Sequence, residues 1–95
     1  MRIISGKKIE NCFENEFIYK YTFDTVWTNE TIERVKMLGH IRIYDSFPRP
    51  MFQVKCYDGT TIKGVRGTDE CRVVFPRDGP SEAKNNFEKR CEEIF

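Results

Sequence analysis

The chain has 95 residues and a formal net charge of +1, with 39% hydrophobic and 33% charged residues. This length indicates one domain (1–95), and the composition is too apolar for a disordered chain and too polar for a membrane-spanning one. The start of the chain lacks the long apolar stretch of a secretory signal, so we expect a cytoplasmic protein.

The first predicted elements differ in the strength of their patterns. Residues 1–15 are hardest to interpret, because Ile3 and Ile4 are typical of a strand whereas Ser5-Gly6-Lys7 is typical of a turn. Residues 17–23 carry an aromatic residue at every second position. This alternation predicts a strand with its rings on one face.

A helix is predicted to begin after Thr28, whose side chain suits the N-cap position. Ile32, Val35 and Leu38 follow at helical spacing and form one apolar stripe. Gly39 is expected to end the helix in the left-handed conformation.

Three further strands are predicted over residues 40–44, 51–57 and 60–66. Asp58-Gly59 between the last two predicts a type I′ hairpin turn, which requires two positive φ angles. Gly64 indicates a bulge or a close backbone approach.

The last elements are a short strand over residues 71–75 and a helix that opens at residues 78–82. One clean apolar stripe marks this helix: Ala83, Phe87, Cys91 and Ile94. The order of elements predicts an α+β fold, with a mostly antiparallel sheet of four to five strands and two helices on one face. The other face of the sheet would then meet solvent.

Basic residues and flat rings gather on this solvent-facing side: Lys20, Arg42, Tyr44, Gln53, Lys55, Tyr57, Lys63 and Arg72. Such a mixture suits single-stranded nucleic acid, because cations hold phosphates and rings stack on bases. Residues 34–77 also carry a balance of +5, whereas the segments before and after them carry −2 each. The alternative is an ordinary solvated sheet, with the acidic ends of the chain neutralising its middle.

The segment 47–52, Phe-Pro-Arg-Pro-Met-Phe, is the most distinctive hexapeptide. Its two prolines would hold Arg49 outward beside apolar groups such as Phe52, a combination that favours a protein partner. The alternative is a stiff connection that protects a sheet edge.

Four cysteines, Cys12, Cys56, Cys71 and Cys91, raise the question of a metal or redox site. The last three fall on predicted core-facing positions, but no two form a C-x-x-C pair and His40 is the sole histidine. Buried thiols are therefore the preferred interpretation, and no cofactor is expected.

No pattern of nucleophile, base and acid supports an enzyme. The sequence favours a non-enzymatic binding or adaptor domain that uses the basic-aromatic sheet face and the 47–52 loop. Single-stranded nucleic-acid binding by the same face, or a small metal-binding or redox cysteine protein, are the alternatives. We expect a protein or nucleic-acid partner, no membrane, and a monomer or homodimer. The predicted binding residues are Arg42, Tyr44, Arg49, Phe52, Lys55, Tyr57, Lys63 and Arg72.

Overall fold

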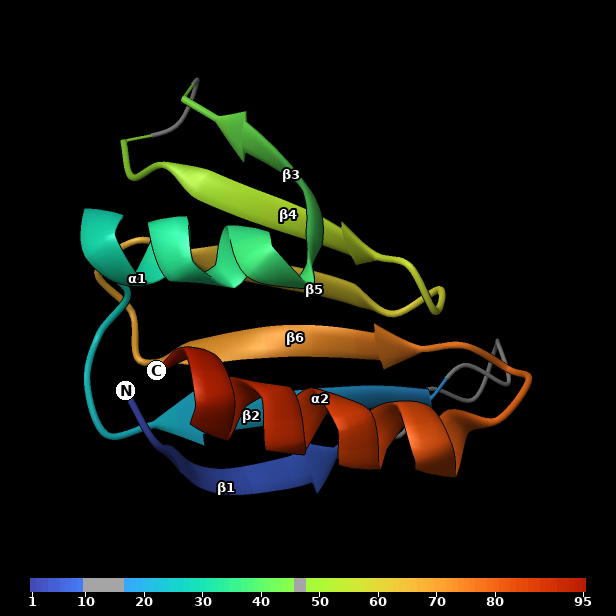
Figure 1. Cartoon of the computed structure of the whole chain (residues 1–95). Coiled ribbons are helices and arrows are strands. Elements are labelled where there is room, and N and C mark those ends of the chain that lie inside the picture. The colour runs from blue at the N-terminus through green and yellow to red at the C-terminus, as the bar shows by residue number, and fades with distance from the viewer. Residues whose placement is uncertain (10–16, 46–47) are drawn as a thin grey trace.

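The computed structural model describes residues 1–9, 17–45 and 48–95, which form an antiparallel sheet and two α-helices (Figure 1). The strand order in the sheet is β1-β2-β6-β5-β4-β3. The strands are β1 Ile3–Lys8, β2 Phe17–Phe23, β3 Gly39–Tyr44, β4 Met51–Cys56, β5 Thr61–Val65 and β6 Glu70–Phe75. The helices are α1 Asn29–Val35, continued by the 3-10 turn η1 Lys36–Leu38, and α2 Pro80–Ile94. The α+β class is confirmed, and the sheet has six strands rather than four to five.

The additional strand is β1, at the edge of the sheet. Its register with β2 shifts between Ile3 and Ser5, and this bulge breaks the alternation that identifies a strand in a sequence. The turn predicted over residues 5–7 is wrong, because Gly6 lies within the strand. A Cβ at Gly6 would come within 2.7 Å of the Tyr21 ring, so the glycine is needed for close packing.

Both helices cover the same face of the sheet, with α1 in front of β4 and β5 and α2 in front of β2 and β6 (Figure 1). The hydrophobic core lies between these two layers. Every member of the predicted stripe on α2 is buried, which confirms it: Ala83, Phe87, Cys91 and Ile94. None of the helices in the described ranges is long and apolar enough to cross a membrane.

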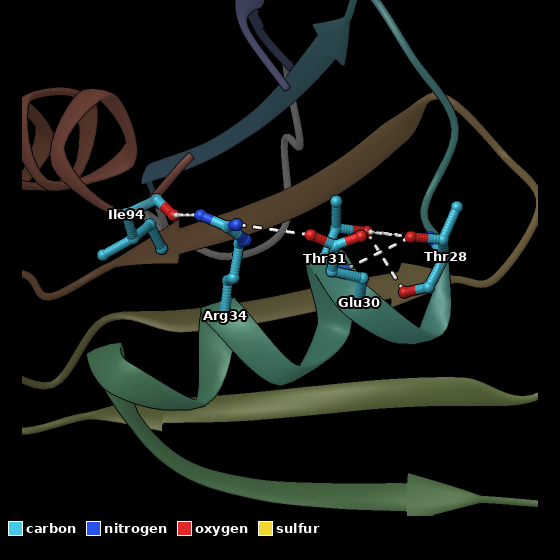
Figure 2. A network of polar contacts seen from close by, with 5 residues as sticks. All are labelled: Thr28, Glu30, Thr31, Arg34 and Ile94. Atoms are coloured by element: carbon cyan, nitrogen blue, oxygen red, sulfur yellow. Dashed lines mark hydrogen bonds and ion pairs between the residues drawn. The ribbon is translucent and has the colours of Figure 1, made fainter.

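The start of α1 is fixed by a capping box in which Thr28 and Thr31 bond each other, as predicted for Thr28 (Figure 2). The Thr28 hydroxyl accepts from the Thr31 amide at 3.2 Å, and the Thr31 hydroxyl accepts from the Thr28 amide at 2.8 Å. Arg34 pairs with Glu30 at 3.2 Å and donates to the carbonyl oxygen of Ile94 at 3.1 Å. This second bond ties α1 to the end of α2.

The predicted left-handed cap at Gly39 is wrong. Helix α1 ends at Val35, a 3-10 turn follows, and Gly39 has an extended backbone with φ 172° as the first residue of β3. The glycine is required for another reason, because a Cβ there would overlap the backbone oxygen of Lys55 on the neighbouring strand. The same reasoning holds at Gly64, where a Cβ would lie 2.5 Å from the Phe52 ring, in agreement with the close approach expected there.

The hairpin between β4 and β5 is not a type I′ turn. Only Gly59 has a positive φ, 94°, while Asp58 does not. The Gly59 amide donates to the carbonyl oxygen of Cys56 at 3.2 Å, and the Cys56 amide donates to that of Thr60 at 2.8 Å. The Asp58 carboxylate accepts from the Thr60 amide at 3.0 Å. These bonds describe a three-residue loop with a glycine bulge, so β4 ends one residue before the predicted Tyr57.

Candidate functional site

A row of mainly basic side chains crosses the outer face of the sheet, opposite the helices. Each residue of the row stands opposite the next one on the neighbouring strand, so every strand contributes one residue. We call it the cation row: Lys7, Lys20, Arg72, Lys63, Gln53 and Arg42. Because neighbouring strands are about 4.8 Å apart, the row is roughly 24 Å long.

Three successive cross-strand pairs in the row bring like charges face to face. Lys7 stands opposite Lys20, Lys20 opposite Arg72, and Arg72 opposite Lys63. All four side chains are exposed. Like charges directly opposite each other destabilise a sheet, whereas an ordinary solvated face gains from pairs of opposite charge. The needs of sheet pairing therefore do not explain this arrangement.

Among the described residues, little negative charge compensates the row. Glu70 is the one acidic residue in the six described strands, and its carboxylate lies 3.5 Å from the Lys20 amine. Both side chains of this pair are nearly half exposed, so the pair contributes little. The other ion pairs among the described residues lie within α1 and α2 or join α1 to the turn that follows it. The described part of the outer face consequently has an excess of positive charge.

Two more predicted binding residues lie on the outer face beside the row. Lys55 is exposed on β4, opposite His40 and Thr61. Tyr44 is 39% exposed at the end of β3, opposite Met51. With Arg42, Lys63 and Arg72 in the row itself, the structure brings five of the eight predicted residues together on one face.

The remaining three predicted residues lie elsewhere. Tyr57 is 93% exposed in the β4–β5 hairpin loop, beyond the end of the strand. Arg49 is exposed in the connection between β3 and β4, and the Phe47 that precedes it lies outside the described residues. Phe52 is 2% exposed and packs against Trp27 with ring centroids 4.7 Å apart, so it belongs to the core.

The described strands place no aromatic ring at the centre of the outer face. The aromatic residues of β2 occupy every second position and lie on the helix side of the sheet, where Tyr21 and Phe23 are each 1% exposed. Tyr44, at one edge of the sheet, is the aromatic residue that the described strands place on the outer face. The site therefore offers cations on five of the six strands, with the neutral Gln53 on β4, and a stacking surface only at its end.

Lys7 is the cation that the sequence interpretation missed, because β1 was not recognised as a strand. The signal that points to it is the Lys7-Lys8 pair itself, since lysines are typical of exposed edge strands. Lys20 was expected on this face, but its position between Lys7 and Arg72 depends on the strand order.

The cysteine alternative finds no support in the described part of the chain. Burial raises the pKa of Cys56 to about 11 and that of Cys91 to about 12, with smaller effects from Asp58 and from Cys56 respectively. Burial also raises the pKa of Cys71. All three are free thiols and protonated at neutral pH, which disfavours metal binding and nucleophilic chemistry. Cys12 lies outside the described residues.

No group of three or more His, Cys, Asp and Glu side chains that could hold a metal ion occurs among the residues that the structure describes. A hollow of about 750 Å³ lies between the start of the chain and α2, and another of about 180 Å³ lies beside the β4–β5 hairpin. Neither is lined by a residue of the cation row. The row is therefore a site on an open surface.

Comparison of the chain with protein-family models, with curated proteins and with solved structures found no significant match. A functional proposal for this protein has to come from the chemistry of the outer face.

Proposed function

We propose that this chain is a non-enzymatic binding domain that holds the phosphate backbone of single-stranded nucleic acid along the cation row. The observation that carries the proposal is the run of three like-charge pairs from Lys7 to Lys63. Each such pair costs a few tenths of a kcal/mol or more in the free protein. A chain of anions lying along the row removes this repulsion and releases its own counterions.

The shape of the row supports a linear and evenly charged partner. The row crosses the sheet from one edge to the other, with one residue on each strand about every 4.8 Å, and five of its six residues are cations. Nucleic acid carries one charge at every nucleotide, whereas acidic side chains in proteins are rarely spaced so regularly. Because rings are absent from the centre of the face, we expect binding to be insensitive to base sequence.

A second candidate function, an adaptor for a protein partner, is favoured by the connection between β3 and β4. Arg49 is exposed there between Pro48 and Pro50, and these prolines limit the conformations of the loop. An exposed arginine on a rigid loop is a suitable anchor for a protein interface. A cytoplasmic location belongs to either proposal, and the three protonated thiols are compatible with a reducing compartment.

Fluorescence anisotropy with a labelled oligothymidylate of 20 nucleotides tests the proposal between 50 and 300 mM salt. The double variant Lys63→Gln/Arg72→Gln should weaken binding and reduce the slope of log K against log salt by about 1.4, at about 0.7 per lost contact. The matched control, Arg77→Gln/Lys89→Gln, removes the same charge from exposed residues outside the sheet and should leave the slope unchanged. Absence of binding at 50 mM salt, or an equal loss in the control, would contradict the proposal.

Labelled polyglutamate serves as the second probe in the same assay. If it binds as tightly as the oligothymidylate and responds equally to the double variant, the partner is an acidic protein segment. That result would overturn the nucleic-acid proposal and favour the adaptor function.

A further inference from the structure

The two edges of the sheet differ in how they are protected. Edge strand β1 has a bulge between Ile3 and Ser5 and ends in two lysines, and both features discourage pairing with another chain. Edge strand β3, at the opposite end of the sheet (Figure 1), has neither a bulge nor a proline, and its register with β4 is continuous from Gly39 to Tyr44. Its Ile43 is 47% exposed. The backbone groups that β3 directs away from the sheet therefore decide whether another strand can pair with it.

The hydrogen bonds of β4 give the orientation of its backbone. The Cys56 amide donates to the carbonyl oxygen of Thr60, and the carbonyl oxygen of Pro50 accepts from the Arg66 amide. Both bonds reach the β5 side of β4. Backbone groups alternate in direction along an antiparallel strand, so the even-numbered residues of β4 face β5 and the odd-numbered ones face β3.

The partners of those odd-numbered residues are the even-numbered residues of β3, as in the pair of Gln53 with Arg42. The even-numbered residues of β3 therefore bond β4. The odd-numbered ones direct their N–H and C=O groups to the open edge, as at Ile41 and Ile43. The Gly39 amide is not available there, because it donates to the carbonyl oxygen of Lys36.

We propose that β3 pairs antiparallel with β3 of a second copy of this chain, with Ile43 opposite the partner's Ile43. In a hydrogen-bonded pairing, odd-numbered residues of one copy must oppose odd-numbered residues of the other. The helices of the two copies then lie on one face of a continuous sheet, and the two cation rows lie on the other face.

Charge and burial select the register. A register centred on Arg42 would oppose the two guanidinium groups, which is unfavourable. A register centred on Ile41 would leave Tyr44 unpaired and place Ile43 opposite a glycine. The register centred on Ile43 covers the two exposed apolar side chains of β3, Ile43 and Tyr44. It also sets Arg42 of each copy opposite the ring of the other copy's Tyr44, which gives two favourable cation–π pairs.

The contact area predicts a weak dimer. One pair of short edge strands buries less than the roughly 800 Å² per partner of a standard stable interface. We expect self-association at protein concentrations on the order of 100 μM or above. If the proposed function is correct, a nucleic acid long enough to lie on both copies would strengthen the dimer by raising their effective concentration.

Disulfide trapping without nucleic acid tests the pairing and its register. In the proposed register, the two copies of residue 43 form a hydrogen-bonded pair with Cα atoms about 5.5 Å apart, which suits a disulfide. The two copies of residue 41 would be offset by four positions, about 13 Å. Mild oxidation should therefore cross-link Ile43→Cys through residue 43, as mapped by peptide mass, and should not cross-link the matched control Ile41→Cys. Failure of Ile43→Cys to cross-link, or cross-linking of Ile41→Cys through residue 41, would overturn the proposal.

Sedimentation velocity of Ile43→Pro gives an independent test. Proline at this position removes an N–H that faces the open edge and leaves the ladder with β4 intact, so circular dichroism should remain native. The variant should stay monomeric at concentrations where the unmodified chain and Ile43→Val associate. A monomeric unmodified chain at about 1 mM would refute the dimer. A short oligothymidylate should bind the unmodified chain and Ile43→Pro equally well. If the unmodified chain associates but binds no oligothymidylate, the proposed function is wrong and the pairing stands.

Discussion

Replacing Arg72 by glutamate is expected to stabilise the fold while it weakens binding of polyanions. Arg72 stands directly opposite Lys20 on β2 and Lys63 on β5, so the substitution turns two repulsions into two attractions. Two charges roughly 6 Å apart in water interact by about 0.7 kcal/mol, and 0.1 M salt reduces this by roughly half. Four such changes give at most about 1.5 kcal/mol, and the mobility of exposed side chains lowers the expected gain to about 1 kcal/mol.

Urea unfolding at 20 and 500 mM salt measures this gain in the free energy of unfolding. Arg72→Gln is the control, because it removes both repulsions and adds no charge beside Glu70, so it should show about half the gain. A gain of about 1 kcal/mol corresponds to a rise in Tm of roughly 4–8 °C for a domain of this size. Anisotropy with the labelled oligothymidylate should show weaker binding in the same order. If Arg72→Glu is less stable than Arg72→Gln at low salt, or if salt does not change the gain in the free energy of unfolding, like charges in the row do not destabilise the folded protein.

Three further predictions concern the fold. Gly64→Ala should lower the free energy of unfolding by about 1–3 kcal/mol in urea unfolding, because its methyl group would overlap the Phe52 ring; an unchanged value would contradict that packing. Thr28→Ala should cost about 1 kcal/mol through loss of the α1 cap, whereas Thr28→Asp should restore most of it; equal stability of both variants would argue against the cap. Thiols ionise near pH 9 in the unfolded chain but need about pH 11 at Cys56 and about pH 12 at Cys91 in the folded one. From pH 9 upward the unfolded state therefore binds fewer protons than the folded state, so the free energy of unfolding should fall as pH rises. The contribution of the thiols to stability is fully present below pH 9. A free energy of unfolding that stays constant from pH 8 to 10.5 would refute this.

Local patterns in the sequence predict the elements whose information lies within one segment. Alternation along residues 17–23 and the stripe of α2 identify buried faces that the structure confirms. The capping residue Thr28 is also a local signal. The errors occur where a distant strand decides the geometry. Gly39 lies in extended backbone because β4 passes close to it, and β1 escapes recognition because its bulge breaks the alternation.

The candidate site shows the same division. Period-two alternation places Lys63 and Arg72 on the outer face, but it does not tell which residues stand opposite each other. That information requires the strand order, in which β2 lies beside β6 and brings Lys20 next to a residue 52 positions away along the chain. The like-charge contacts of the cation row arise from these long-range pairings. A local sequence pattern therefore predicts a basic surface, and only the register reveals the repulsion within it.

The two faces of the sheet have separate physical roles, and this separation makes the proposals testable. Side chains alternate between the faces, so a substitution at Arg72 leaves the helix-side packing of its neighbours Cys71 and Val73 in place. Burial on the helix side stabilises the sheet sufficiently to tolerate repulsion on the outer side. Substitutions in the row should consequently alter binding and salt dependence without disturbing the core, and should change the free energy of unfolding only through the charge repulsion, by about 1 kcal/mol or less. Core substitutions should lower the free energy of unfolding and leave the charges of the row in place. If the cations of the row bound no partner, exchanging them for glutamine would remove repulsion without weakening the binding of any polyanion. Measuring unfolding and oligothymidylate binding on the same variants distinguishes this case from the proposed function.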